Sequence, residues 1–263
     1  MTVIREPAVA GQFYPGDAEE LGRKVEFLLD EVNSGAGDAP KALIVPHAAY
    51  IYSGSVAAKA YVRLRPYRNQ YRRVILLGPC HRVPVQGLAL SGADVFRTPL
   101  GDVPLDKEAI ASIDSSCVEI FDETHESEHS LEVHLPFLQS VLGSFTIVPI
   151  VVGNTTYERV ADVLDILWGG PETLIVISSD LSHYLSYDRA RAIDGATRQA
   201  IEDLEVRGID HDVACGATPI GGLLITAKRR GMKVTTLDMK NSGDTGGDRR
   251  YVVGYGSWEL LEQ

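Results

Sequence analysis

Cysteines and long hydrophobic runs are scarce in this chain. Three cysteines among 263 residues, Cys80, Cys117 and Cys215, are odd in number and far apart, which excludes a disulfide framework and a CxxC metal knuckle. No apolar stretch reaches the roughly 20 residues of a transmembrane helix, and the N-terminal residues are too polar for a signal peptide. We therefore expect a cytoplasmic protein with reduced thiols and no membrane partner.

Basic residues are outnumbered by acidic ones. The formal net charge of −11 argues against a nucleic-acid partner, which would require a basic face. Apolar residues make up 44% of the chain and charged residues 23%, as in an ordinary globular protein rather than a disordered or fibrous one. The length is ample for a sizeable core.

The chain does contain short apolar runs rich in valine and isoleucine, which alternate with segments of helical spacing. Strand-like runs occupy residues 42–46, 73–78, 147–153 and 173–180, and helix-like segments occupy residues 54–64, 157–168 and 187–204. Continuous apolar strands between helices are typical of a sheet that is covered on both faces. The sequence predicts an α/β fold with a central, mostly parallel or mixed β-sheet flanked by helices.

Chemically capable side chains follow three of the predicted strands. His47 and His81 follow the first and second runs, and Asp180 and His183 follow the fourth. Open α/β sheets bind ligands outside the carboxyl ends of their strands. Two histidines and a carboxylate would form the facial triad of non-haem Fe(II) or a catalytic zinc site. A lone histidine after a strand is more often an ordinary polar residue, but here three histidines occur at three strand ends.

Another polar cluster spans residues 126–137 (ESEHSLEVHLPF). In a helix, His129 and Glu132 would share a face and form a polar wall with acid–base capacity. The alternative is a solvated helix start, and Pro136 makes a regular helix through this stretch doubtful. The order and spacing do not match an HExxH metalloprotease motif.

A glycine-rich segment, NSGDTGGD, spans residues 241–248. For Asp248 the favoured interpretation is a plain turn, whereas Asp244 could form part of a turn or supply a carboxylate ligand. The segment lacks the lysine of a phosphate-binding P-loop. Covalent catalysis by Cys80 with the adjacent His81 is disfavoured, because sequence neighbours seldom present their side chains to each other.

These motifs together resemble the Memo family, which is related in fold to class III (LigB-type) extradiol dioxygenases. The resemblance runs nearly end to end, through REPAVAGQFYPGD, PHAAYIYSG, LGPCH, EHSLEVHLPFLQ, SSDLSHY, CGATPIGGLL and NSGDTGGDRRYVVGY. It implies one Memo-like domain over residues 1–263, with a metal pocket that corresponds to the dioxygenase active site.

Carried over by position, the resemblance makes His47 and His81 two metal ligands. The third falls in the NSGD region, where animal members have a cysteine and this chain offers Asp244. A carboxylate there would favour Fe(II), with zinc or copper as alternatives. His183 resembles the acid–base histidine of the dioxygenases. Asp180, His129 and Glu132 resemble its companions in the pocket.

The resulting hypothesis is an oxidoreductase of extradiol-dioxygenase type that acts on a small molecule. Bacterial and archaeal relatives often accompany radical-SAM and AMMECR-type proteins, in the AmmeMemoRadiSam grouping, which implies pathway partners of those kinds. The alternatives are a non-catalytic protein that binds a metal or a peptide, and a metal-dependent hydrolase.

Overall fold

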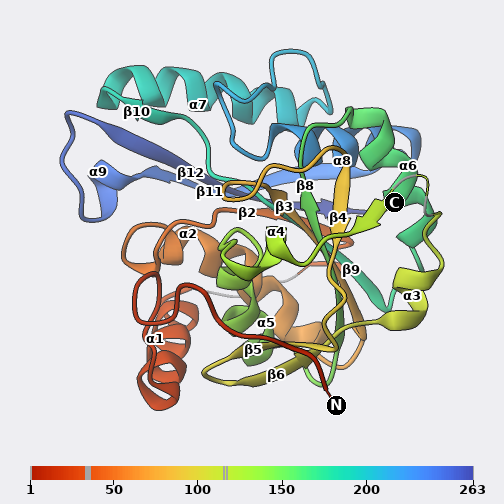
Figure 1. Ribbon diagram of the computed structural model, residues 1–263. Helices are drawn as coiled ribbons and strands as arrows, with labels where there is room; N and C mark the ends of the chain where they lie inside the picture. Colours follow the sequence, from red (N-terminus) through yellow and green to blue (C-terminus); the bar gives the residue numbers. More distant parts are fainter. Residues whose placement is uncertain (1, 33–36, 115, 117, 263) are drawn as a thin grey trace.

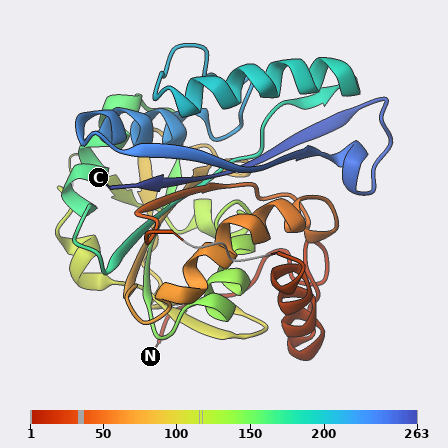
Figure 2. The same cartoon turned by 180° about the vertical axis from the view of Figure 1, so that it is seen from behind.

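A nine-stranded mixed sheet organises the computed structural model, which describes residues 2–32, 37–114, 116 and 118–262. Figures 1 and 2 show it from opposite sides. The strand order is β10-β12-β2-β9-β3-β8-β4-β7. The ninth strand, β11, also pairs with β12, on the side opposite β2. The strands are β2 (Ala42–Val45), β3 (Arg73–Pro79), β4 (Leu88–Leu90), β7 (Val118–Ile120), β8 (Thr146–Val152), β9 (Thr173–Ser178), β10 (His183–Leu185), β11 (Lys233–Asn241) and β12 (Val252–Leu261).

The centre of this sheet is parallel and its flanks are antiparallel. β2, β9, β3 and β8 are parallel neighbours, whereas β12 pairs antiparallel with β2, and β4 pairs antiparallel with β8. The predicted α/β class with a mostly parallel or mixed sheet is thus confirmed. Because the four central strands run the same way, the loops that leave their carboxyl ends meet at one edge of the sheet.

Alternate residues of each central strand enter two different hydrophobic cores. In β2, Leu43 and Val45 belong to one core, and Ala42 and Ile44 belong to the other. Successive strand side chains point to opposite faces, so a sheet buried on both faces needs an uninterrupted apolar strand. This is why the strands read as continuous apolar runs. Each fully buried valine, leucine or isoleucine contributes about 1.5–3 kcal/mol to stability.

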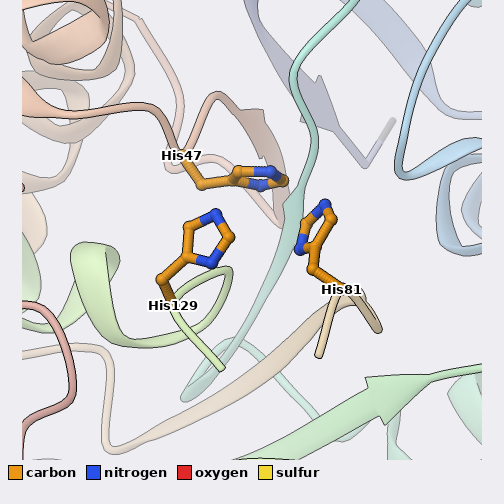
Figure 3. Close-up of side chains that lie close together, drawn as sticks. All are labelled: His47, His81 and His129. Atoms are coloured by element: carbon orange, nitrogen blue, oxygen red, sulfur yellow. The ribbon is translucent and has the colours of Figure 1, made fainter. Parts of the chain in front are cut away.

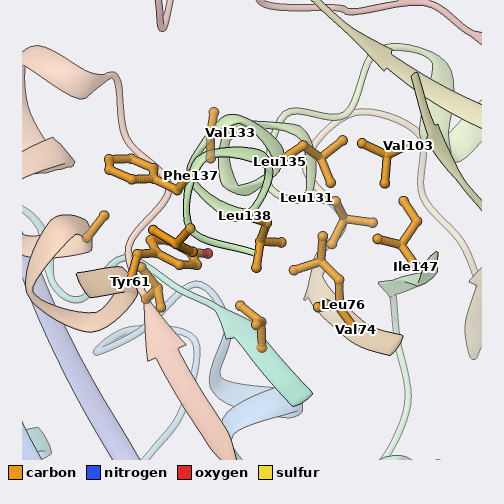
Figure 4. Close-up of a cluster of buried hydrophobic side chains, with 14 of the residues drawn as sticks. Tyr61, Val74, Leu76, Val103, Leu131, Val133, Leu135, Phe137, Leu138 and Ile147 are labelled. Atoms are coloured by element: carbon orange, nitrogen blue, oxygen red, sulfur yellow. The ribbon is translucent and has the colours of Figure 1, made fainter. Parts of the chain in front are cut away.

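Helices cover both faces of the sheet (Figures 1 and 2). Residues of α1 (Ala18–Asp30), α2 (Tyr50–Tyr61) and α5 (Leu135–Val141) pack in the first core, part of which Figure 4 shows around Leu76 and Leu138. Residues of α6 (Tyr157–Leu167), α7 (Tyr187–Glu202) and α8 (Ala217–Arg229) pack in the second. The remaining short helices are η1 (Val62–Tyr67), α3 (Lys107–Ala111), α4 (Glu123–Glu126), η2 (Glu132–His134) and α9 (Ser242–Thr245).

A second, three-stranded sheet has the order β1-β5-β6, with β1 (Ile4–Arg5) parallel to β5 (Val95–Thr98) and β6 (Gly101–Pro104) antiparallel to it. In the part of the chain that is described, no helix is long and apolar enough to cross a membrane.

The segment around His129 is irregular, in line with the doubt that Pro136 raised. α4 ends at Glu126, and helical structure resumes only with η2 and then α5, which has Pro136 in its first turn. A proline is tolerated there because its missing N–H has no partner within the helix. His129 is therefore carried by a loop rather than by a helix face.

Candidate metal centre

Three histidines from distant parts of the chain converge at the carboxyl edge of the sheet. His47 follows β2, His81 follows β3, and His129 lies between α4 and η2. One ring nitrogen from each lies within 4.8 Å of the others. The ring centroids are 5.1 Å apart for His47 and His81, 5.5 Å for His47 and His129, and 4.8 Å for His81 and His129 (Figure 3). This group of three histidines could bind one metal ion.

The tautomer of His47 is set by Ser178, at the end of β9. The Ser178 hydroxyl lies 2.6 Å from the Ser130 carbonyl oxygen and 2.6 Å from His47 Nδ1. A carbonyl oxygen only accepts, so the single hydroxyl proton is donated to Ser130, and Nδ1–H of His47 must donate to Ser178. The other ring nitrogen, Nε2, then carries the lone pair that a metal requires.

Glu128 holds the other two histidines in place. Its carboxylate lies 3.0 Å from His81 Nδ1 and accepts from the backbone N–H of His81 at 2.6 Å, of His129 at 3.0 Å and of Ser130 at 2.9 Å. An ionised carboxylate can only accept, so His81 donates from Nδ1 and keeps its lone pair on Nε2. The carboxylate–histidine pair is the usual support of a histidine metal ligand.

Burial and hydrogen bonding set the charges of this cluster. Burial and the neighbouring imidazoles hold the pKa of His47 well below its usual range, and burial lowers the pKa of His129 to about 4. At Glu128, burial acts the other way, but the hydrogen bonds from His81 and Ser130 prevail and lower the carboxyl pKa to about 2. At neutral pH the His47 and His129 imidazoles are therefore neutral beside an ionised glutamate, as metal binding requires.

A glycine allows the loop that carries His129 to lie against β3. A Cβ built at Gly78 would lie 2.8 Å from the Ser130 hydroxyl and 2.8 Å from a methyl carbon of Leu131. The Ser130 hydroxyl donates to the Pro79 carbonyl at 2.9 Å. This close approach of the loop to the strand end brings His129 to the other two histidines.

Asp180 and Cys215 both contact His47. The Asp180 carboxylate accepts from the His47 backbone N–H at 2.8 Å, and burial raises its pKa to about 7. The Cys215 sulfur lies 3.4 Å from His47 Nε2. Burial, and then the charge of Asp180, raises the pKa of this thiol to about 12, so the sulfur is protonated at neutral pH.

Two cavities lie against the histidines. One, of about 460 Å³, is lined by His129, Asp180 and His183 together with aromatic side chains. The other, of about 500 Å³, is lined by His81, Cys80, Cys215 and His211, among others. Cavities of this size accommodate small molecules. The cluster thus meets small-molecule space at His81 on one side and at His129 on the other.

His183, the acid–base group expected from the sequence, lines the first cavity. Burial lowers the pKa of its imidazole, and the charge of His81 acts in the same direction. The ring is therefore neutral at neutral pH and able to accept a proton.

Asp244 lies apart from the three histidines, and here the structure differs from the expectation of a carboxylate ligand. Its side chain forms a capping box at the start of α9, where Oδ2 accepts from the Asn241 N–H at 3.1 Å. Oδ1 accepts from the Tyr187 hydroxyl at 2.7 Å and lies 3.9 Å from Arg249. The local turn uses one oxygen, which is the structural alternative that the sequence left open, and α7 uses the other through Tyr187. His129 joins His47 and His81 instead.

Glu132 also has a different role from the one expected. It is fully buried and accepts hydrogen bonds from the Arg5 guanidinium, the Tyr14 hydroxyl and the backbone N–H groups of Ala8 and Val9. With its oxygens engaged by the N-terminal segment, Glu132 ties that segment to η2 and does not orient the imidazoles. Glu128 does so in its place.

The sequence did not single out Glu128, Ser178 or Cys215. Glu128 directly precedes His129, and Ser178 stands two residues before Asp180, so both belong to polar clusters that were recognised. Their partners are the histidines of other segments, which come close only in the folded chain. Cys80, by contrast, donates from its thiol to the Val83 carbonyl at 2.7 Å, which offers no support for covalent catalysis with His81. Cys117 lies outside the described residues.

Known proteins match this chain over nearly its whole length. The family model described as Memo-like protein matches residues 5–259. A MEMO1 family protein of Aquifex aeolicus is 39% identical over 264 residues, covering 96% of this chain and 97% of the relative. Another, from Aeropyrum pernix, is 38% identical over 275 residues, covering 96% and 98%.

A solved structure described as an uncharacterized protein, JW3007 from Escherichia coli K12, shares the fold. Its TM-score is 0.50 at 10% sequence identity, over 83% of this chain and 98% of that one. At this identity the likeness concerns the fold alone. The family match over nearly the whole chain and the two relatives together show that this protein belongs to the Memo family.

Proposed function

We propose that this protein is a metalloenzyme in which His47, His81 and His129 hold a divalent metal ion beside a small-molecule cavity. The observation that carries the proposal is the convergence of three imidazoles within 4.8 Å. Two of them are fixed by hydrogen bonds at Nδ1, which places the lone pair on Nε2. Three protein ligands with open space beside them are typical of catalytic metal sites, whereas structural sites are closed by four.

The donor set consists of nitrogen atoms, which suit iron, copper and zinc. We propose Fe(II), since the family resembles the extradiol dioxygenases and the adjacent cavity is rich in aromatic side chains that suit a phenolic substrate. A redox-active ion in this position would supply electrons for the activation of dioxygen. Copper or zinc could use the same three imidazoles.

The residues of the cavity supply proton transfer. His183 is neutral at neutral pH because burial lowers its pKa, so it can accept a proton from a substrate hydroxyl. Asp180, with a pKa of about 7, can share that proton, and its hydrogen bond to the His47 backbone holds this histidine loop in position. The mostly apolar walls exclude water from the bound ring.

The test is metal analysis after anaerobic purification, followed by oxygen uptake with a panel of catechols. We expect close to one metal ion per chain, lost in His47→Ala. His183→Ala should keep the metal and lose oxygen uptake, because the proton acceptor is absent. His211→Ala, on the second cavity, serves as the matched control and should keep both. A wild-type chain that binds no metal under any condition would contradict the proposal.

Metal-dependent hydrolysis is the second candidate, because three histidines are also the ligands of a catalytic zinc ion that activates water. Hydrolysis of activated esters by the zinc-loaded protein, without oxygen uptake by the iron-loaded one, would favour it. Metal binding with neither activity would indicate a binding protein. The radical-SAM and AMMECR-type partners remain part of the proposal, and co-purification tests them.

A further inference from the structure

The cavity beside the histidines has a closed inner end and an open outer end. Asp180 at the inner end is almost fully buried, with 5% of its surface exposed. At the outer end, Tyr52, Tyr184 and Tyr251 are 37%, 73% and 73% exposed. We call these three side chains the tyrosine rim. A substrate ring seated beside the metal ligands would therefore extend its substituent toward the tyrosine rim.

The backbone holds Tyr184 in a costly conformation. Its φ of 56° lies in the left-handed region, which a bulky residue rarely adopts, and the pairing of β10 with β12 shifts register between His183 and Leu185. In a regular strand His183 and Tyr184 would point to opposite faces. Here both line the same cavity, with ring centroids 5.9 Å apart. Strain of this kind concentrates at ligand-binding sites.

The charges of the wall favour one kind of substituent. Among the described residues that line this cavity, Asp180 and Asp248 carry carboxylates, and no lysine or arginine is present. The cation nearest to Asp248 is Arg250, whose guanidinium lies 2.6 Å from that carboxylate at the surface. An anionic substituent at this open end would find no cationic partner among these lining residues. An ammonium group would meet tyrosine side chains, whose ring faces attract cations.

We propose that the substrate is a phenolic amine, with its ring hydroxyls toward the histidines and its ammonium group against the tyrosine rim. This inference rests on the proposed function, since it places a phenolic ring at the metal centre. It assigns specificity to Tyr184 and Asp248, which lie on the outer part of the cavity. Catechols with a carboxylate or phosphate in the same position are disfavoured substrates.

The test compares two ligands of equal ring chemistry, 4-(2-aminoethyl)catechol and 3,4-dihydroxyphenylacetate, with 4-methylcatechol as the uncharged reference. Binding is measured by calorimetry to the zinc-loaded protein, so the readout does not depend on turnover. We expect the amine to bind about three- to fivefold more tightly than the carboxylate, the equivalent of one cation–π contact at an exposed site.

Two variants at Tyr184 and one at Asp248 sharpen the test. Tyr184→Gly should lose most of the amine preference while its thermal unfolding midpoint stays equal or rises, because glycine adopts the left-handed conformation without strain. Tyr184→Phe keeps a ring face and should keep the preference. Asp248→Asn should weaken amine binding and strengthen carboxylate binding, since it frees Arg250.

The outcomes separate this inference from the proposed function. If both charged ligands bind but the carboxylate binds equally well or better, the inference is overturned and the catechol site stands. If Tyr184→Gly leaves the preference intact, the role of the tyrosine rim is overturned. If none of the three catechols binds to the metal-loaded protein, the inference and the proposed function both fail.

Discussion

Replacing Glu128 by glutamine would test how the metal ligands are held. The carboxylate is 1% exposed and accepts four hydrogen bonds, three of them through Oε1 and one, from the His81 backbone, through Oε2. A glutamine amide presents one oxygen and one NH2 group. With its oxygen in the place of Oε1, the NH2 group faces the His81 N–H, and two donors meet with no acceptor between them.

The magnitude follows from the lost partners. A buried donor without an acceptor costs about 1–3 kcal/mol, and the remaining bonds change from charge-assisted to neutral ones, which are about half as strong. We expect the Glu128→Gln protein to be about 2–4 kcal/mol less stable to unfolding. Because the acceptor of His81 Nδ1 changes from a carboxylate to a neutral amide oxygen, which supports a metal-bound imidazole less well, metal affinity should fall about 10–100-fold.

The pH dependence of stability provides a second measurement. The Glu128 pKa is lowered in the folded state to about 2 from an unfolded value of 4.5, so the stabilisation is present above pH 4.5 and is lost as the pH falls toward 2. At 1.36 kcal/mol per pKa unit, this amounts to about 3 kcal/mol. The glutamine variant should lack this part of the acid destabilisation, and its unfolding free energy should converge with that of the wild type at low pH.

Urea unfolding between pH 3 and 7 and competition with a chromophoric chelator give the two readouts. Glu126→Gln makes the same chemical change at an exposed position two residues away and should alter neither by more than about 0.5 kcal/mol. A Glu128→Gln protein with wild-type stability and wild-type metal affinity would refute the reasoning, because four buried hydrogen bonds would then have no energetic consequence.

Two further substitutions separate stability from metal binding. Glu132→Gln should lower the free energy of unfolding in urea by about 3–5 kcal/mol, because it leaves the buried Arg5 guanidinium without its anion. Its metal affinity under native conditions should not change. A parallel loss of affinity would place Glu132 in the metal site. Ser178→Ala should have the opposite effect, because His47 loses the acceptor at Nδ1. We expect the metal affinity measured with the chelator to fall about tenfold and the free energy of unfolding to fall by only about 1 kcal/mol. Unchanged affinity would show that Ser178 does not set the tautomer of His47.

The fold and two of the three clustered histidines could be predicted from the sequence because both depend on regular patterns. Uninterrupted apolar strands indicate a sheet covered on both faces, and parallel strands bring the residues that follow them to one edge. His47 and His81 are brought together for this reason. These inferences need only the strand boundaries and the direction of the chain.

The remainder of the site depends on contacts between irregular segments, which no periodicity encodes. His129 reaches the group because Gly78 lets its loop approach β3, and Glu128 faces inward because three backbone N–H groups converge on it. Asp244 looked like a ligand by position, but its own turn uses one of its oxygens and Tyr187 uses the other. An aspartate in such a segment can either cap a short helix or bind a metal, and the sequence alone does not show which of the two roles it has.

The hydrogen bonds that the imidazoles donate to Ser178 and Glu128 have a consequence for the order of folding and metal binding. His47 precedes His129 by more than eighty residues, and the serine that orients His47 lies nearly fifty residues further on, so the cluster is complete only after β2, β9 and β3 have paired. Small zinc domains require their metal in order to fold. Under the proposed function, this chain would fold first and acquire the ion later. A cell could therefore keep the folded protein without metal and control its activity through the supply of metal rather than through synthesis of new protein.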